Sequence, residues 1–442
     1  MNKIDFPADF LWGTATASYQ VEGAAYEGGR GGCIWDTFSR KPGAVYAGES
    51  GAVACDQYHR YTEDADLMAE LGFKSYRFSI AWPRILPEGT GTVNKEGIAY
   101  YRNLCQELKK RGIHTCATLY HWDLPQALED TGGWPNRSIV DAFREYVKVC
   151  YKELGDLVDM WITINEPFCV AYLGHLYGAH APGIKDQDKA LAAVHHVNMA
   201  HGVAVQEYRA SGLKAPIGIT WNPSTPRPAT KSEADKKAAD ISRAFNTEVF
   251  IFPCLGKGYP ELVTKELGLN LPVKDGDMEL IAQGIDFIGV NYYSEYPMAA
   301  DEDAPYKFSG KNFWQEKTAM GWPYSPAGLK RQLKWIAEIS NGIPIYITEN
   351  GCACEDVVTG DRVHDPQRVK YLQQHLSVCT DAIKEGVPLK GYYVWSLLDN
   401  FEWSFGYTKR FGIIHVDFKT MKRTVKDSGY FLRDTIAGYG EW

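Results

Sequence analysis

The chain has 442 residues, of which 45% are hydrophobic and 23% are charged, a composition typical of a globular protein. Its formal net charge of -8 argues against nucleic acid or an anionic membrane as a partner. No apolar stretch reaches the length of a membrane span, and the N-terminal "MNKIDFPADFLWG" lacks the apolar core of a signal peptide. We therefore expect a cytoplasmic protein.

Eight short runs rich in β-branched or aromatic residues recur along the whole chain and predict strands. In chain order they are residues 10–16 ("FLWGTAT"), 75–80 ("SYRFSI"), 114–120 ("HTCATLY"), 160–165 ("MWITIN"), 216–222 ("PIGITWN"), 286–293 ("DFIGVNYY"), 345–350 ("IYITEN") and 391–399 ("GYYVWSLLD"). Segments with helical periodicity separate these runs, and no linker or short repeat interrupts the alternation.

Three of the intervening segments carry clear start and stop signals of helices, at residues 138–155, 325–342 and 365–386. In the last of them Asp365 is expected to cap the helix, Pro366 suits the first turn, and a glycine ends it. The apolar side chains within each segment recur at helical spacing, so each helix is expected to bury one face.

Strands alternating with helices predict an α/β protein, a single (β/α)₈ TIM barrel spanning 1–442 as one catalytic domain. Such a barrel needs ~250 residues, so the surplus must lie in loops. The gaps are long after the first, fourth, fifth, sixth and eighth strands. Long loops at these places predict a deep pocket on the C-terminal face of the barrel, where barrel enzymes keep their active sites.

Polar and aromatic side chains gather where the predicted strands end. The set comprises Gln20, Arg77, His121, Trp122, Asn165, Glu166, Asn291, Tyr293, Glu349, Asn350, Trp395, Glu402 and Trp403. A barrel brings these ends together around one cavity. Carboxylates and amides suit sugar hydroxyls, indole rings suit the C–H face of a sugar, and hydrolysis of a glycosidic bond requires two carboxyl groups.

Metal and phosphate chemistry find little support in the sequence. The ten cysteines form no CxxC pair, the first strand has no H-x-H, and no Cys/His spacing fits zinc. The loops after the last two strands do not resemble a glycine-rich phosphate site. We therefore expect buried free thiols, no metal and no cofactor.

Several motifs resemble those of one enzyme family, and they occur in that family's order. They are "FPADFLWGTATASYQVEGAAYEGGRGGCIWDTF", "SYRFSIAWPRILPEG", "TLYHWDLPQAL", "TINEP", "HAPG", "VNYY", "YITENG" and "WSLLDNFEW". The family is glycoside hydrolase family 1, retaining β-glycosidases of the β-glucosidase kind. The resemblance covers the chain from about Phe6 to Val416 and implies the same barrel fold.

The resemblance implies roles for five residues around the reacting bond. Glu166 would be the general acid/base and Glu349 the nucleophile, with carboxyl groups ~5–5.5 Å apart for a retaining reaction. Arg77 would lie against Glu349 and keep it ionised. Tyr293 would donate a hydrogen bond to Glu349, and Asn291 would help to position Glu166.

The resemblance also implies a substrate-binding set. Asn165 would bind the 2-hydroxyl of the sugar and Trp395 would form the floor of the sugar site. The remaining hydroxyls would be bound by Gln20, His121, Glu402 and Trp403. The pocket and the leaving-group site would be shaped by Trp122, Phe411 and Trp322, although a single tryptophan is also typical of a core. Phe168, Cys169 and Leu173 are expected to influence the leaving-group preference.

Structural alternatives exist for several of these residues. Glu166 could cap the helix after the fourth strand, and Glu349 could belong to a structural ion pair. Arg77 must be paired wherever it is buried, so a structural salt bridge competes with its catalytic role. His121 could be a core histidine with its hydrogen bonds satisfied, and His180 is expected to be structural.

Glu402 and Trp403 stand where family members that act on 6-phosphorylated glycosides bind the phosphate through other residues. A carboxylate there favours an unphosphorylated substrate. The leading hypothesis is a retaining exo-β-glucosidase acting on cellobiose, short cello-oligosaccharides and aryl β-glucosides, with side activity on β-fucosides and β-galactosides. A 6-phospho-β-glucosidase and a non-catalytic sugar-binding barrel are the alternatives. The sequence leaves a homo-oligomer open.

Overall fold

The structure, a computed structural model, describes residues 6–313 and 316–438. Residues 1–5, at the start of the N-terminal stretch considered above, lie outside the described residues. So do residues 439–442, at the end of the expected single domain.

All eight predicted strands form, and they close into one parallel barrel. The strands are β1 (Leu11–Ala15), β2 (Ser75–Ser79), β3 (His114–Tyr120), β4 (Met160–Asn165), β5 (Ile217–Trp221), β6 (Phe287–Tyr292), β9 (Ile345–Asn350) and β12 (Leu389–Trp395). The order around the barrel is β1-β12-β9-β6-β5-β4-β3-β2. This confirms the predicted (β/α)₈ barrel. The last strand ends earlier than predicted, because residues 396–399 belong to the loop that follows β12.

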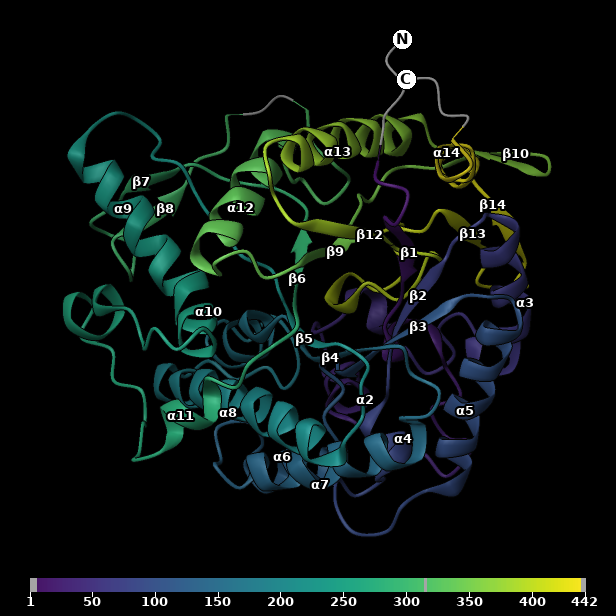
Figure 1. The fold of residues 1–442 in the computed structure, drawn as a ribbon, viewed down its shortest axis with the longest axis horizontal. Coiled ribbons are helices and arrows are strands. Elements are labelled where there is room, and N and C mark those ends of the chain that lie inside the picture. The colour runs from purple at the N-terminus through teal and green to yellow at the C-terminus, as the bar shows by residue number, and fades with distance from the viewer. Residues whose placement is uncertain (1–5, 314–315, 439–442) are drawn as a thin grey trace.

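Helices surround the strands (Figure 1). They are α1 (Ser18–Val21), α2 (Ile34–Phe38), α3 (Gln57–Glu70), α4 (Trp82–Ile85), α5 (Lys95–Lys110), α6 (Gln126–Asp130), α7 (Ile139–Leu154), α8 (Gln187–Ser211), α9 (Glu233–Arg243), α10 (Val249–Cys254), α11 (Asp277–Ile281), α12 (Pro326–Ile339), α13 (Pro366–Lys384) and α14 (Asp427–Ile436). Short 3₁₀ or π turns occupy η1 (Tyr46–Gly48), η2 (Cys169–Leu173), η3 (Ala244–Glu248), η4 (Leu262–Glu266) and η5 (Trp403–Phe405). Within the described ranges, no helix has the length and apolar character needed to cross a membrane.

The three helices with clear sequence signals form at the predicted places, as α7, α12 and α13. The predicted cap at Asp365 is wrong in its side-chain contacts. Asp365 occupies the N-cap position, but its side chain does not cap the helix. Its carboxylate instead pairs with Arg368 and accepts hydrogen bonds from Ser428. The buried guanidinium of Arg368 needs a counter-charge, and this demand prevails over capping.

Three small hairpins lie in the loops that follow the later strands. They are β7 (Met298–Ala300) with β8 (Phe308–Gly310), β10 (Val357–Thr359) with β11 (Arg362–His364), and β13 (Ile414–Val416) with β14 (Arg423–Val425). The first and third lie in loops that were expected to be long. The second follows β9, after which the sequence did not predict a long loop.

The inside of the barrel is filled below the pocket. One buried cluster joins apolar side chains of five strands, including Cys116, Met160, Ile162, Phe287 and Tyr393. The barrel is therefore a packed core rather than a channel. A substrate must enter from the loop side.

Bulges in β4 and β9 change which side chains face inward. In β4, Met160 and Ile162 belong to the inner cluster. Thr163 points to the helix side, where its hydroxyl forms a hydrogen bond with His201 of α8. The register with β5 then shifts between Ile162 and Asn165, and Asn165 points back to the inside. In β9 the register with β6 shifts just before Glu349. One extra residue in each strand thus re-aims a polar side chain, a known use of bulges near active sites.

Buried ion pairs hold the loop after β12 to Lys426, which lies between β14 and α14. The Lys426 ammonium lies 2.7 Å from Asp399 and 2.6 Å from Asp356, and its side chain is fully buried. Arg410 also contacts Asp399, at 2.6 Å. Charges removed from water stabilise a fold only when they are paired.

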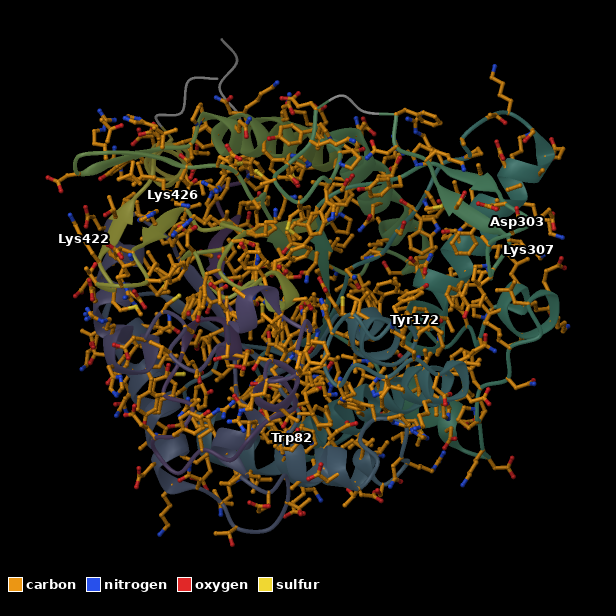
Figure 2. All side chains as sticks on the ribbon, turned by 180° about the vertical axis from the view of Figure 1, so that it is seen from behind. Trp82, Tyr172, Asp303, Lys307, Lys422 and Lys426 are labelled. Atoms are coloured by element: carbon orange, nitrogen blue, oxygen red, sulfur yellow. The ribbon has the colours of Figure 1, made fainter. Side chains whose placement is uncertain are left out.

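We predict that Lys426→Met destabilises the protein by about 3–5 kcal/mol, because two buried carboxylates lose their shared cation. The matched control is Lys422→Met, since Lys422 lies in the same region (Figure 2) and pairs with Asp361 at an exposed site. It should change stability by less than about 1 kcal/mol. Urea unfolding followed by tryptophan fluorescence measures both. Equal midpoints for the two variants would contradict the prediction.

Candidate active site

A cavity of about 510 Å³ lies where the strands of the barrel end. Eleven of the residues proposed from the sequence line it: His121, Trp122, Glu166, Asn291, Tyr293, Trp322, Glu349, Trp395, Glu402, Trp403 and Phe411. The other three are Gln20, Arg77 and Asn165, each fully buried and in contact with lining residues. The predicted pocket on the loop side is therefore present.

The Glu349 carboxylate is held on both oxygens. Arg77 Nη1 donates to Oε1 at 2.6 Å, and the Tyr293 hydroxyl donates to Oε2 at 2.5 Å. Arg77 Nη2 donates to Asn165 Oδ1 at 2.6 Å, and its Nε donates to Thr118 at 3.2 Å. The guanidinium therefore fixes Glu349 and Asn165 relative to each other.

The Glu166 carboxyl group is held by two different donors. Asn291 Nδ2 lies 2.6 Å from Oε1, and the Cys169 thiol lies 3.0 Å from Oε2. The same Asn291 amide is 3.1 Å from Asn165 Oδ1. Glu166 itself has a φ of 48°, a left-handed conformation that is uncommon outside glycine. Pro167 follows and starts the next helical turn, so the chain leaves the strand with Glu166 facing the cavity.

Burial raises the pKa values of the three carboxyl groups of the cavity. Burial, with the nearby charge of Glu349, raises the pKa of Glu166 to about 7. Burial, with the charges of the other two carboxylates, raises the pKa of Glu402 to about 8. Burial also raises the pKa of Glu349, but Arg77 and Tyr293 oppose it. The negative charge therefore resides preferentially on Glu349.

Gln20 and His121 place polar atoms at the base of the cavity. The Gln20 amide nitrogen donates to Asn400 and to the carbonyl of Phe401, and lies 3.5 Å from Glu402 Oε2. The Gln20 Oε1 and His121 Nδ1 atoms are buried and have no hydrogen-bond partner among the described residues. Burial lowers the pKa of His121 well below its usual value, so its ring is neutral. Such groups suit hydroxyls, which both donate and accept.

Aromatic rings form the walls. The Trp122 and Trp403 rings are 4.7 Å apart, and the His121 ring stacks against Trp395 at 6.0 Å. Trp122 also donates its indole N–H to the carbonyl of Asn165 at 2.9 Å. Both Trp122 and Trp403 have positive φ values, 77° and 51°. The backbone therefore holds two large rings in conformations that few non-glycine residues adopt.

A further group of aromatic and apolar side chains lines the cavity. Trp322 lies 6.2 Å from Phe411 and 5.5 Å from Tyr293, measured between ring centroids. Phe168, Cys169 and Leu173, which were expected to influence the leaving-group preference, also line the cavity.

Ten lining residues were not proposed from the sequence as site residues, among them His180 and Asn222. His180, expected to be structural, lines the cavity and packs 5.4 Å from Trp122. Asn222 follows the end of β5, and its amide lies 3.6 Å from the Cys169 sulfur. An amide directly after a strand was the signal used elsewhere in the chain, so the same rule would have found Asn222.

A closed barrel whose cavity holds a paired carboxylate, a carboxyl group of raised pKa and a wall of indole rings defines a glycoside hydrolase. The family model of "Glycosyl hydrolase family 1" matches residues 2–441. The chain belongs to glycosyl hydrolase family 1.

Relatives and solved structures resemble this protein along its whole length. Beta-glucosidase A of Thermotoga maritima is 50% identical, over 100% of this chain and 99% of that protein. Beta-glucosidase A of Acetivibrio thermocellus is 47% identical, over 100% of both. The structure of the Thermotoga maritima β-glucosidase in complex with glucoimidazole has a TM-score of 0.96 at 49% identity, covering 99% of this chain and 100% of that one.

We predict that Glu349→Gln lowers the pKa of Glu166 from about 7, because the variant removes a nearby negative charge that disfavours the Glu166 anion. The value should stay above the usual 4.5, since burial is the larger cause. Carbon-13 NMR of protein labelled at the glutamate carboxyl carbons measures it, with Glu166→Gln identifying the resonance. An unchanged or higher pKa would contradict the prediction.

Proposed function

We propose that the protein is a retaining exo-β-glucosidase that removes terminal, non-reducing β-D-glucosyl residues. The observation that carries this proposal is the unequal setting of two carboxyl groups in one cavity. Glu349 is paired with a cation, whereas Glu166 is not and has a pKa raised to about 7. One is suited to attack as an anion, and the other to deliver a proton near neutral pH.

In the proposed reaction, a Glu349 oxygen attacks the anomeric carbon while Glu166 protonates the departing glycosidic oxygen. A glycosyl ester of Glu349 forms and the leaving group departs. Glu166, now ionised, takes a proton from water, which attacks the same carbon and releases glucose with its configuration retained. Arg77 and Tyr293 would stabilise Glu349 each time it departs as a carboxylate, and Asn291 would orient Glu166.

The remaining residues would bind the sugar. Asn165 is proposed to bind the 2-hydroxyl, a contact that strengthens in the transition state. The floor would be Trp395, and the other hydroxyls would be bound by Gln20, His121, Glu402 and Trp403. Trp122, Trp322 and Phe411 would shape the pocket toward the leaving group.

The proposed substrates are cellobiose, short cello-oligosaccharides and aryl β-glucosides, with β-fucosides and β-galactosides as side activities. The lack of a cationic side chain among the described lining residues of the cavity disfavours a 6-phosphate. No lysine or arginine is among its lining residues in the described part of the chain, while Glu402, Glu166 and Glu349 are. A dianionic phosphate would be desolvated there without a counter-charge, which is costly.

We further propose that residues 1–442 act as one catalytic domain and that the protein works in the cytoplasm. All ten cysteines are free, as is typical of a reducing compartment.

The function is tested by following glucose release from 4-nitrophenyl β-glucoside and from cellobiose. We predict that kcat/KM for the aryl glucoside exceeds that for its 6-phosphate by at least about 100-fold, because of the unpaired phosphate charge. Proton NMR should show β-glucose as the first product. Turnover of the 6-phosphate alone, or α-glucose as the first product, would contradict the proposal.

We predict that Glu349→Ala loses turnover by about 10⁴–10⁶-fold, as expected when a nucleophile is removed. Azide should restore part of the activity on an aryl glucoside by attacking in place of the carboxylate, in a single inversion that gives an α-glucosyl azide. The matched variant Glu166→Ala should instead give the β-azide, because azide then attacks the glycosyl ester. A β-azide from Glu349→Ala would contradict the assignment.

A further inference from the structure

Two buried thiols lie close together just after the strand that carries Glu349. Cys352 and Cys354 follow β9, and their sulfur atoms are 3.3 Å apart. Cys352 is fully buried and Cys354 is 4% exposed. They pack with Tyr324 and Tyr371 in a small cluster of their own. The proposed reaction uses neither thiol.

The spacing of the two cysteines permits a bond between them. Residues two positions apart have Cα atoms at most about 7 Å apart, and disulfides span about 4.4–6.8 Å between Cα atoms. The sulfur–sulfur bond is about 2.0 Å long. Starting from 3.3 Å, the sulfurs need to approach by about 1.3 Å. A local movement of the loop is therefore sufficient.

The two thiols lie in different surroundings. The hydrogen bond from Cys352, helped by the charge of Arg368, lowers the pKa of Cys354 below its usual value. Burial raises the pKa of Cys352 well above its usual value. Arg368 is fixed beside them, with its Nε donating to the carbonyl of Cys352 at 3.1 Å. Since the thiolate is the reactive form, we expect Cys354 to be the thiol that reacts first with an oxidant.

A short path of contacts connects this pair to Glu349. Asn350 separates Glu349 from the loop, and its amide donates to the Tyr371 hydroxyl at 3.1 Å. That hydroxyl donates to the carbonyl of Tyr293 at 2.8 Å. Tyr293 in turn holds Glu349. A movement of Cys352 therefore reaches the nucleophile both along the chain and through Tyr371.

Ala353, between the two cysteines, forms a second connection. It belongs to the buried cluster that contains Trp395 and Phe411, against which Trp322 packs. Drawing the two sulfurs together would move Ala353 within the cluster that supports Trp395 and Phe411, two residues of the pocket wall.

We propose that Cys352 and Cys354 form an oxidisable dithiol, which a hydroperoxide closes to a disulfide with a loss of turnover. The Cys354 thiolate attacks the peroxide, its O–O bond breaks, and a sulfenic acid forms with release of hydroxide. The Cys352 thiol then displaces the sulfenic oxygen as water, giving the disulfide. Two electrons pass from the thiols to one peroxide. The effect on turnover rests on the proposed function, but the bond itself does not.

The test treats the full-length protein with hydrogen peroxide, blocks the remaining thiols with N-ethylmaleimide and digests with trypsin. The peptide of residues 335–362 contains Cys352 and Cys354 and no other cysteine. It should be unalkylated and lighter than the reduced peptide by two hydrogen atoms. Activity on the aryl glucoside should fall by at least about tenfold, since a displacement of about 1 Å can cost about 100-fold. Dithiothreitol should restore activity.

Cys352→Ala and Cys354→Ala should keep their activity in peroxide. The matched control Cys379→Ala, which removes a buried thiol from α13, should remain as sensitive as the unaltered protein. Alkylation of both cysteines after peroxide treatment would overturn the proposal. A disulfide formed with full activity would overturn the coupling to the site. If no glycoside were hydrolysed at all, the peptide mass would still decide whether the bond forms.

Discussion

The buried guanidinium of Arg77 is the interaction on which the site depends. It lies on β2 and contacts Thr118 of β3, Asn165 of β4, and Thr348 and Glu349 of β9. A charge fully removed from water must find partners for its donors, and a planar guanidinium fixes the directions in which they lie. The strands that close around Arg77 therefore place an amide and a carboxylate at set positions before any substrate arrives.

The same cation makes the carboxyl groups of the cavity unequal. Glu349 forms the ion pair with Arg77. Glu166 and Glu402 are buried near the negative charge of Glu349. Their pKa values rise to about 7 and about 8, so near neutral pH protons reside on them rather than on Glu349. Chemically identical side chains thus acquire different proposed roles through their surroundings alone. Asn291 and Cys169, which donate to the two oxygens of Glu166, keep its pKa from rising further.

The sequence predicts the barrel well, because buried parallel strands are short apolar runs bounded by turn residues. It also predicts that the polar residues at strand ends gather in one place. Strict alternation, in contrast, would not place both Ile162 and Asn165 inside the barrel, and a bulge leaves no mark in a single sequence. The Asp365 side chain was misassigned because two partners compete for it: Arg368, whose burial the sequence does not reveal, and Ser428, which is distant in the sequence. Whether a residue lines the cavity, as His180 does, or lies behind it, as Gln20 does, depends on loop packing.

The bulges of β4 and β9 have a consequence for how this chain can vary in length. Deleting or inserting one residue before Asn165 or Glu349 would turn these side chains toward the helices, so such changes would abolish the site at once. The hairpins in the loops do not affect the register of these two strands, so their lengths can change without turning Asn165 or Glu349. Selection can therefore change these loops by gain and loss of residues, while the two strands admit only substitutions.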